Sequence, residues 1–488
     1  MKIVHIASEC APVAKAGGLG DVVQGLSREL SAQGHQVIII LPFYGCLKKE
    51  YFESFTPQIE HFEAIEGDVS YPASASSAVV TGCKLLLLDA EHPKGYFQRD
   101  QIYGYEDDIP RFLFFNHLAL QYLHKQQEYI DIVHLHDWHT AIIPILYKDL
   151  YQKRGLRIGK HIFTIHNLEY QGKCGSHDLD QIGLRGSHYL SMDQLQDTDP
   201  NHSNSINLLK SGILYSNAIT TVSPTYAQEI LEPKLSFGLD AVLRAYRGKL
   251  TGILNGIDSH IWSPSTDRMI PVEYSKLDTP EAITRAKLQN KHFLQNKLHL
   301  QKSTAPLIVC ISRLVPQKGP EMIQTAITHS LQFGAQFVLL GSSPISQIQA
   351  TFNHLKKEYK SNPNVHLIFD YNETISHLIF AAADFLVMPS IFEPCGLSQL
   401  IALSYGTIPI VRETGGLKDT VFDINSKDPQ KNGITFQDPT PEAMKEAIDR
   451  ALKLWKSPKK MDSLRKKAMN IDSSWKKPCS EYLKIYSE

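Results

Sequence analysis

The sequence lacks the features of several protein classes. Its 488 residues include seven widely spaced cysteines and no Cys-x-x-Cys pair, which indicates free thiols in a reducing compartment. No run of 18 apolar residues occurs, and the polar start MKIVHIASEC does not fit a signal peptide, so we expect no membrane or export segment. The formal net charge of −1 gives no indication of nucleic-acid binding. We therefore expect a soluble cytoplasmic protein that binds neither nucleic acid nor membrane.

Short apolar runs separated by helical stretches dominate the chain, a pattern typical of parallel α/β sheets. Hydrophobic residues make up 42% of the sequence, and the length allows two or three domains with large cores. The apolar runs that predict buried strands are residues 3–7, 37–41, 84–88, 131–135, 161–165 and 218–222, and then 306–312, 336–341, 365–369, 384–390 and 407–411.

Between the two series of strands the chain becomes polar and rich in proline, which indicates a domain boundary. The predicted organisation is a first domain at 1–260, a boundary segment at 261–303, a second domain at 304–470 and a C-terminal helix at 471–488 that packs back on the first domain. Each domain is predicted to be a doubly wound α/β fold. A substrate is then expected in a cleft where the carboxyl ends of both sheets face each other.

The stretch AKAGGLGDVV (14–23) follows the first strand and precedes a helix expected to open at Asp21. Its glycines permit close approach of a ligand to the backbone, and a helix N-terminus attracts anions. The spacing matches neither GxGxxG nor GxxxxGK[ST]. The residues alone leave open an anion site with Lys15 as a mobile cation, or a simple turn between strand and helix.

Polar groups follow three strands of the first half. In HLHDWH, His134, His136 and Asp137 end one strand, and metal binding with His139, binding of sugar hydroxyls and burial in the core are all open. His166 and Asn167 follow the next strand, and Asn255 ends a third within NGID. Such neutral and acidic groups suit a polyol. The Asp-x-Asp pairs Asp178/Asp180 and Asp197/Asp199 lie in polar loops and are interpreted as solvated.

The second half supplies cations for a phosphate group. Arg313 and Lys318 lie five residues apart just after a strand, which suits a diphosphate because Arg binds as a fork and Lys as a point charge. Glu393 precedes a Pro-Cys-Gly turn. Thr414, Gly415 and Gly416 come where a helix should begin, so their amides are candidates for phosphate binding.

Taken together, KAGGLGDVV, HDWH, TIHNLEYQG, NGID, SRLVPQKG, FEPCGLSQL and TGGLKDTV resemble the motifs of the bacterial glycogen and starch synthase family, in the same order from residue 15 to about 421. The resemblance implies a GT-B fold of two Rossmann-like domains. It also implies transfer of glucose from ADP-glucose to the non-reducing end of an α-1,4-glucan, with retention of configuration. The acceptor would be glycogen or a maltooligosaccharide primer, and neither a metal nor another cofactor is expected.

The resemblance also implies residue roles. The residues expected to act in catalysis are Arg313, Lys318, Glu393, His166 and Asp137. Those expected to bind the donor are Lys15, Gly17, Gly18, Asn255, Thr414, Gly415 and Gly416, and those expected on the acceptor side are Glu9, Tyr226 and Glu229. Many GT-B enzymes carry a second Glu eight residues after the first, where this chain has Ile401, so a scheme with two carboxylates in that loop is in doubt.

Three alternatives remain on the sequence alone. The chain could be another GT-B enzyme, such as one that uses UDP-glucose or a glucan phosphorylase. It could be an inactive glucan-binding protein, although the set of Lys15, Arg313, Lys318 and Glu393 argues against this because a binder needs no diphosphate cations. It could also be a metal-dependent hydrolase built on the HxHD histidines, which loss of activity in EDTA would indicate.

Overall fold

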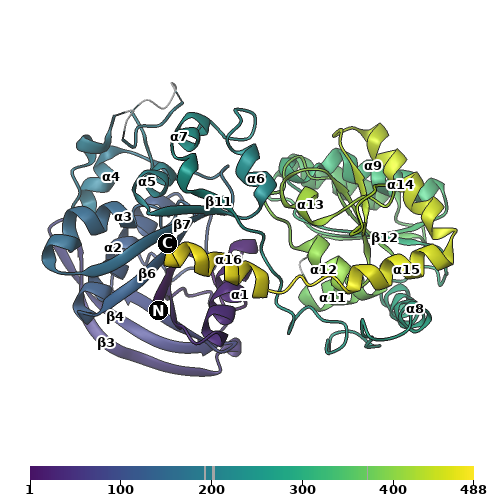
Figure 1. Ribbon diagram of the computed structural model, residues 1–488, viewed down its shortest axis with the longest axis horizontal. Coiled ribbons are helices and arrows are strands. Elements are labelled where there is room, and N and C mark those ends of the chain that lie inside the picture. The colour runs from purple at the N-terminus through teal and green to yellow at the C-terminus, as the bar shows by residue number, and fades with distance from the viewer. Residues whose placement is uncertain (192–193, 200–203, 371) are drawn as a thin grey trace. The chain divides into compact units, whose positions relative to one another are not determined.

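The computed structural model describes residues 1–191, 194–199, 204–370 and 372–488. They form two compact units: unit 1 comprises Met1–Gly256 with Trp475–Glu488, and unit 2 comprises Ile257–Ser474. In each unit a central sheet is covered by helices (Figure 1). Each is a separate α/β layer structure, as the alternation of apolar runs and helical stretches predicts.

Unit 1 is built on a nine-stranded sheet with the order β11-β10-β7-β6-β1-β2-β5-β4-β3. All its pairs are parallel except those of β3 with β4 and β4 with β5. The strands are β1 (Lys2–Ile6), β2 (Gln36–Pro42), β3 (Ser54–Glu66), β4 (Val69–Val80), β5 (Cys83–Ala90), β6 (Tyr129–His136), β7 (Arg157–Ile165), β10 (Ala218–Thr221) and β11 (Leu250–Gly252), with a separate pair β8 (Lys173–Cys174) and β9 (Ile206–Asn207). Because β2 lies on one side of β1 and β6 on the other, the chain reverses its direction of travel across the sheet at β1, where α/β proteins bind ligands.

The helices of unit 1 are α1 (Gly18–Ala32), α2 (Asp108–Gln126), α3 (Ile143–Leu146), α4 (Ser176–Gln181), α5 (Leu208–Tyr215), α6 (Pro224–Glu229), α7 (Asp240–Ala245) and α16 (Lys476–Ser487). The C-terminal helix α16 buries its tyrosines against α1 and the sheet. Trp475 lies directly on Gly25 of α1, where an added Cβ would lie 2.0 Å from the indole nitrogen. Glycine at this position therefore lets the last helix pack closely on the first.

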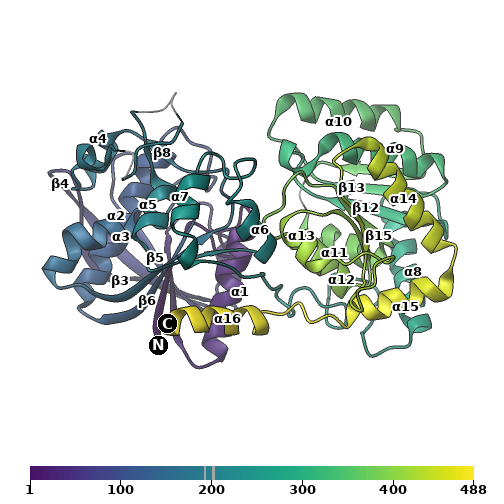
Figure 2. The same ribbon diagram turned by 45° about the horizontal axis from the view of Figure 1, so that its top comes forward.

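Unit 2 has a six-stranded parallel sheet with the order β14-β13-β12-β15-β16-β17. The elements are β12 (Leu307–Ile311), β13 (Gln336–Leu340), β14 (Val365–Ile368), β15 (Phe385–Met388), β16 (Ile408–Arg412) and β17 (Ile434–Phe436), with α8 (Pro280–Lys297), α9 (Pro320–Gln332), α10 (Ser346–Glu358), α11 (Glu373–Ala382), α12 (Ser398–Ser404), α13 (Gly415–Thr420), α14 (Pro441–Trp455) and α15 (Pro458–Met469). Helices α8, α11 and α12 share one hydrophobic core, and α9, α10 and α14 share another (Figure 2). In this sheet the strands are added outward from β12 on one side and then outward from the adjacent β15 on the other, so the order reverses between β12 and β15.

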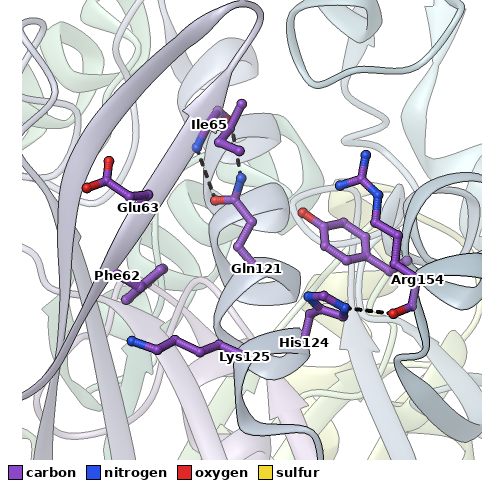
Figure 3. Close-up of a pocket in the computed structure, with 8 residues that line it drawn as sticks. Phe62, Glu63, Ile65, Gln121, His124, Lys125 and Arg154 are labelled. Carbon is purple, nitrogen blue, oxygen red and sulfur yellow. Dashed lines mark hydrogen bonds between the residues drawn. The ribbon is translucent and has the colours of Figure 1, made fainter.

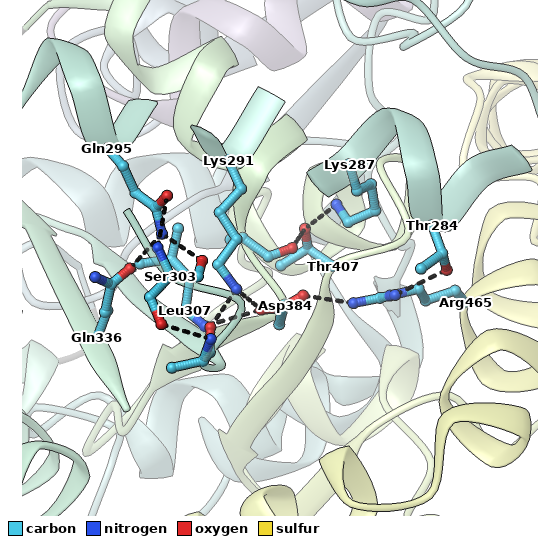
Figure 4. Close-up of polar contacts among 12 residues, drawn as sticks. Thr284, Lys287, Lys291, Gln295, Ser303, Leu307, Gln336, Asp384, Thr407 and Arg465 are labelled. Carbon is cyan, nitrogen blue, oxygen red and sulfur yellow. Dashed lines mark hydrogen bonds and ion pairs between the residues drawn. The ribbon is translucent and has the colours of Figure 1, made fainter. Parts of the chain in front are cut away.

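The segment 261–303, which we expected as a domain boundary, is part of unit 2 because buried polar groups bind α8 to the sheet (Figure 4). Lys291 Nζ donates to Asp384 Oδ2 over 2.9 Å, and Arg465 donates to Asp384 Oδ1 over 2.5 Å. Burial would raise the pKa of Asp384, but these two cations lower it below its usual range. Lys287 Nζ donates to three backbone carbonyl oxygens and to the Thr407 hydroxyl.

Every apolar run expected to form a buried strand coincides with a strand, from β1 to β16. The sequence analysis missed the β3–β4 hairpin, whose β3 residues are mostly exposed, and the short strand β17. Helix α1 begins at Gly18 rather than Asp21. Among the residues that the structure describes, no helix combines the length and the apolar character needed to cross a bilayer.

Candidate functional site

Four residues predicted to act in unit 1 lie at the carboxyl ends of its parallel strands. Glu9 follows β1, Asp137 follows β6, His166 follows β7 and Asn255 follows β11. Strands β1, β6 and β7 are consecutive in the sheet, so Glu9, Asp137 and His166 come from adjacent loops, while β10 separates β11 from β7. Sheet order therefore places three of the four together at the point where ligands bind in doubly wound folds.

The carboxylate of Glu9 binds the amides of the glycine-rich stretch. Glu9 Oε2 accepts the N–H groups of Ala16 at 2.7 Å and Gly17 at 2.8 Å, and the Tyr103 hydroxyl donates to Oε1 at 2.9 Å. Burial raises the pKa of Glu9. Two amides of this stretch therefore bind a side chain of the protein itself, and this contact holds the loop against Glu9. The Gly17 amide is thus engaged, and Gly18 is already the first residue of α1.

Lys15 lies on the exposed side of this loop. Its Nζ atom is 2.7 Å from Asp21 Oδ1, in a pair whose side chains are both partly exposed. Exposed pairs of this kind are weak and exchange readily with solvent or ligand. Lys15 is therefore positioned as a cation that a phosphate could draw away from Asp21.

Asp137 organises the loop after β7. Its backbone is in the left-handed region, with φ of 53°, which a non-glycine residue rarely adopts. The side chain is buried, and Oδ1 accepts the N–H groups of His166 at 2.7 Å and Asn167 at 3.4 Å. Burial raises the pKa of Asp137 to about 7. Asp137 thus holds His166 in place and carries a proton whose release falls near neutral pH.

A row of histidines lies at this loop, in which His5, His134 and His136 are fully buried and His166 is partly buried. His5 Nδ1 is 3.1 Å from His136 Nε2, and His136 Nδ1 is 3.0 Å from His166 Nε2. His134 hydrogen-bonds through Nδ1 to the Tyr486 hydroxyl at 2.7 Å and through Nε2 to the Thr164 hydroxyl at 2.6 Å. His5 carried no signal in the sequence because it lies inside an apolar strand with no motif around it.

Three of these histidines could hold a metal ion. The ligand nitrogens of His5, His134 and His136 lie within 4.8 Å of one another. This is a different group from the one that the HxHD motif suggested, because Asp137 and His139 are not part of it. Burial holds the pKa values of all three imidazoles far below their usual range, so the rings are neutral. Neutral imidazole is the form that binds metals, but it is also the form that packs in a core.

Three more residues predicted to act in unit 1 are Tyr226, Asn255 and Glu229, and their hydrogen bonding and burial differ. The Tyr226 hydroxyl, fully buried in α6, accepts the Leu168 N–H at 3.1 Å, so it supports the loop after His166. Asn255 is buried, and its Oδ1 has no hydrogen-bond partner in the described part of the chain. A buried acceptor without a partner is costly, and a bound ligand could satisfy it. Glu229, at the end of α6, is partly buried.

In unit 2 the predicted cation and carboxylate lie together at the reversal point of the sheet. Lys318 ends a short 3-10 helix after β12, and Glu393 lies in the loop after the adjacent β15. Lys318 Nζ is 2.5 Å from Glu393 Oε2, which also accepts the Ser390 hydroxyl at 2.9 Å. An ammonium has three donors, so two remain for a ligand after this contact. The contact with Glu393 therefore orients the Lys318 ammonium and leaves N–H donors for a ligand.

The Thr414–Gly416 turn packs directly on the Glu393 loop. An added Cβ would lie 1.9 Å from the Glu393 carbonyl oxygen at Gly415 and 2.1 Å from the Cys395 oxygen at Gly416. The Gly416 N–H donates to the Glu393 oxygen at 3.0 Å. Gly416 thus differs from our expectation of a phosphate donor, because its amide is engaged within the chain. Both glycines permit the close contact that shapes the Glu393 loop.

Arg313 stands apart from these contacts. Its side chain is exposed, and within the described ranges the structure records no hydrogen bond or ion pair of its guanidinium. It follows β12 by two residues, as Lys318 follows it by seven. Arg313 is therefore available to a ligand at the same strand end.

Other candidates from the sequence have structural roles. Ile401 stands where many GT-B enzymes have a second carboxylate. It belongs to α12 and is buried in the hydrophobic core that α12 shares with α8 and α11. In the Asp-x-Asp pairs, Asp178 accepts the Gly175 N–H at the start of α4, and Asp180 accepts the Gly186 N–H. Asp197 accepts the Asp199 N–H and forms an ion pair with Lys173. These carboxylates stabilise the backbone around them. Asp197 is buried, so the interpretation of these pairs as solvated is wrong for this residue.

An open pocket of about 220 Å³ lies elsewhere in unit 1, between β3 and α2, and none of the predicted site residues lines it (Figure 3). Gln121 of α2 accepts the Ile65 N–H at 3.2 Å, and His124 contacts the Arg154 carbonyl oxygen at 3.0 Å. These contacts tie the β3–β4 hairpin and a neighbouring turn to α2. The pocket is therefore the space left where the β3–β4 hairpin packs against α2, and we assign it no function.

Comparison with known proteins matches almost the whole chain. Residues 2–245 match the starch synthase catalytic domain family, and residues 294–468 match the glycosyl transferases group 1 family. The glycogen synthase of Protochlamydia amoebophila is 47% identical, over 100% of this chain and 99% of that protein. Glycogen synthase 1 of Trichormus variabilis is 42% identical, again over 100% of this chain and 99% of that protein.

Solved structures give the same relationship. The catalytic domain of starch synthase IV from Arabidopsis thaliana, bound to ADP and acarbose, has a TM-score of 0.96 and 41% identity, and the alignment covers 100% of this chain and 98% of that one. Sucrose-phosphate synthase from Thermosynechococcus elongatus has a TM-score of 0.60 at 17% identity, over 99% of this chain and 98% of that one, which shows a shared fold alone.

Proposed function

The chain belongs to the glycogen and starch synthase family and is a GT-B hexosyltransferase, and on this premise we propose which substrates and side chains its reaction uses. We propose that ADP-glucose is the donor and that the non-reducing end of an α-1,4-glucan, either glycogen or a maltooligosaccharide, is the acceptor. ADP and the oligosaccharide mimic acarbose, both bound to the starch synthase IV domain, support this pair.

The observation that carries the proposal is the Lys318–Glu393 pair at the reversal point of the unit 2 sheet. We assign the diphosphate to Lys318 and Arg313, which supply a point charge and a fork from one strand end. Glu393, beside them, would lie next to the ribose and glucose of the donor. The Thr414–Gly416 turn then supports this binding mainly by shaping the Glu393 loop, since the Gly416 amide is already used.

The step to be catalysed is loss of ADP from the glucosyl carbon. The bond from C1 to the phosphate oxygen breaks as a bond from C1 to the acceptor 4-oxygen forms. The proton of the acceptor hydroxyl passes to the departing diphosphate. If the acceptor attacks from the face that ADP leaves, configuration is retained without an enzyme nucleophile. Lys318 and Arg313 then stabilise negative charge that grows in the transition state.

The unit 1 residues are assigned to the sugars. His166 and Asn255 offer hydrogen bonds to hydroxyl groups, and the buried Asn255 Oδ1, which lacks a partner among the described residues, supports such a role. Asp137 acts through His166, whose backbone it holds. Lys15 would contact the donor phosphate, while Glu9, Tyr226 and Glu229 shape the acceptor side. We also propose that no metal takes part and that the enzyme works in the cytoplasm.

The decisive experiment is transfer of radiolabelled glucose to a glycogen primer from ADP-glucose and UDP-glucose in parallel, each with and without EDTA. We expect faster incorporation from ADP-glucose and no effect of EDTA. Preference for UDP-glucose would reassign the donor, and incorporation from neither would refute the synthase assignment. Loss of activity in EDTA would favour a metal at the buried histidines.

A further inference from the structure

Three histidines of unit 1 form a continuous row, of which the reaction as proposed uses only the partly buried His166. It runs from His5 in β1 through His136 at the end of β6 to His166 after β7, with nitrogen–nitrogen distances of 3.1 and 3.0 Å. Both distances are those of hydrogen bonds, so each contact needs one N–H and one lone pair. The row therefore has a direction, set by which ring donates to the next.

All three rings are neutral. Burial lowers the pKa of His5 and of His166 to about 3, and burial with the neighbouring histidines lowers the pKa of His136 far below its usual range. A neutral imidazole carries one N–H. Because both nitrogens of His136 are engaged, it must donate on one side and accept on the other, and only two arrangements of the row remain.

The far nitrogen of His5 distinguishes the two arrangements. His5 Nε2 is buried and has no hydrogen-bond partner among the described residues. If the row donated toward His5, this nitrogen would carry an unsatisfied buried N–H. If the row donates away from His5, the nitrogen has only an unused lone pair. Orphaned buried N–H groups are the rarer of the two in proteins, so the second arrangement is favoured.

We propose that His5 and His136 are positioning residues that fix the tautomer of His166. His5 Nδ1–H donates to His136 Nε2, and His136 Nδ1–H donates to His166 Nε2. His166 is then left with its proton on Nδ1, and it presents a hydrogen-bond donor rather than an acceptor. The consequence for catalysis rests on the proposed function, in which His166 binds a substrate hydroxyl. The tautomer itself does not depend on that assignment.

The competing occupant of this cluster is a metal ion on His5, His134 and His136. The contacts of His134 argue against it, because both of its nitrogens already hydrogen-bond to the hydroxyls of Tyr486 and Thr164. A metal would also have to replace the short contact between His5 and His136. The hydrogen-bonded row uses every one of these contacts as they stand.

The first test reads the tautomer directly. The full-length protein is labelled with ¹⁵N-histidine, and long-range correlation spectra separate Nδ1–H from Nε2–H rings, with His166 assigned by loss of its signals in His166→Asn. We expect His166 as the Nδ1–H tautomer in the wild type and in His5→Asn, whose amide can still donate. We expect a mixture in His5→Leu. An Nε2–H His166 in the wild type, or stoichiometric zinc that His5→Leu abolishes, would overturn the proposal.

The second test measures kcat with ADP-glucose and a glycogen primer. By analogy with the partners of metal-bound histidines, whose loss costs about 10- to 100-fold, we expect about a 10-fold fall in kcat for His5→Leu and near-complete recovery in His5→Asn. His161→Leu is the matched control, because His161 is buried in β7, has a pKa lowered to about 4 and is not in the row. We expect its kcat to stay at the wild-type value.

An equal fall of kcat in His5→Leu and His161→Leu would mean that the loss of activity comes from a general disturbance of the structure. Unchanged kcat in His5→Leu with the expected tautomer shift would remove the catalytic consequence. If the wild type transfers no glucose, the proposed function fails, and the NMR result still decides the order of protons in the row.

Discussion

The two units carry opposite chemistry at equivalent places in similar sheets. In unit 1 the strand ends hold buried, neutral or acidic groups, with Asp137 and His166 joined by a hydrogen bond. In unit 2 they hold the cations Arg313 and Lys318 with one carboxylate. Even the glycine-rich turns differ, because Glu9 occupies the amides of one while the other packs against the Glu393 loop. In the proposed reaction, the same α/β frame therefore supplies sugar-binding groups in one unit and phosphate-binding groups in the other.

The largest expected effect tests the cations of unit 2. Lys318→Ala should lower kcat with ADP-glucose by about 10²-fold or more, with a smaller rise in donor KM, because in the proposed reaction Lys318 stabilises the negative charge that develops as ADP leaves. Steady-state kinetics with a glycogen primer measures both constants. Lys357→Ala, which changes an exposed lysine of α10, is the control and should behave as wild type. A near-normal kcat in Lys318→Ala would remove the proposed leaving-group role.

The next effect compares the two glycine-rich turns. Gly415→Ala would place a Cβ 1.9 Å from the Glu393 carbonyl oxygen at a residue with φ of 44°, so we expect a loss of about 2 kcal/mol or more in unfolding free energy, together with weaker ADP binding. At Gly17 an added Cβ would lie 4.0 Å from Glu9 Oε1, so Gly17→Ala should change stability little. Denaturant titration of both variants makes the comparison. Equal losses of unfolding free energy in the two variants would show that the two turns do not differ in how closely they are packed.

The acidic group of unit 1 predicts a pH-dependent difference. Burial raises the pKa of Asp137 to about 7, so its charged form destabilises the folded state. Above the unfolded pKa, near 4, the wild type therefore loses stability relative to Asp137→Asn as the pH rises to about 7. Because one pKa unit corresponds to about 1.4 kcal/mol, we expect the variant to be more stable by about 4 kcal/mol at pH 8 and by little at pH 4, but with greatly reduced kcat. A constant difference across this range would show that Asp137 does not titrate there.

The smallest expected effect concerns the exposed cation of unit 1. Lys15→Ala removes an exposed pair with Asp21, which contributes under about 1 kcal/mol to stability. We expect an unchanged melting temperature and a rise in the KM for ADP-glucose of about 3- to 10-fold, which corresponds to about 0.7 to 1.4 kcal/mol, the range of an ordinary net hydrogen bond. An unchanged donor KM would leave the stretch as a turn organised by Glu9 alone.

The prediction of strands from the sequence succeeded where burial on both faces forces a continuous apolar run, as in β1 and β12. It missed β3, which is largely exposed and contains a proline, so the chain shows no such run there. It also assigned α8 to a boundary segment, because Lys287 and Lys291 are typical of a solvated helix face. Their burial depends on Asp384 and on carbonyl oxygens about 93 residues away.

The sequence by itself determined which chemical groups stand at the strand ends, and hence the family, the fold and the proposed division between sugar and phosphate binding. Only the tertiary structure decided how these groups are used. It brought Glu9 onto the Gly17 amide, set Lys318 against Glu393 and joined His5 to His136 across 131 residues of chain. Periodicity and motifs are patterns among residues close together in the sequence. A hydrogen bond joins atoms that are close together in space, whatever their separation in the sequence. The order of β1, β6 and β7 in the sheet supplies those neighbours.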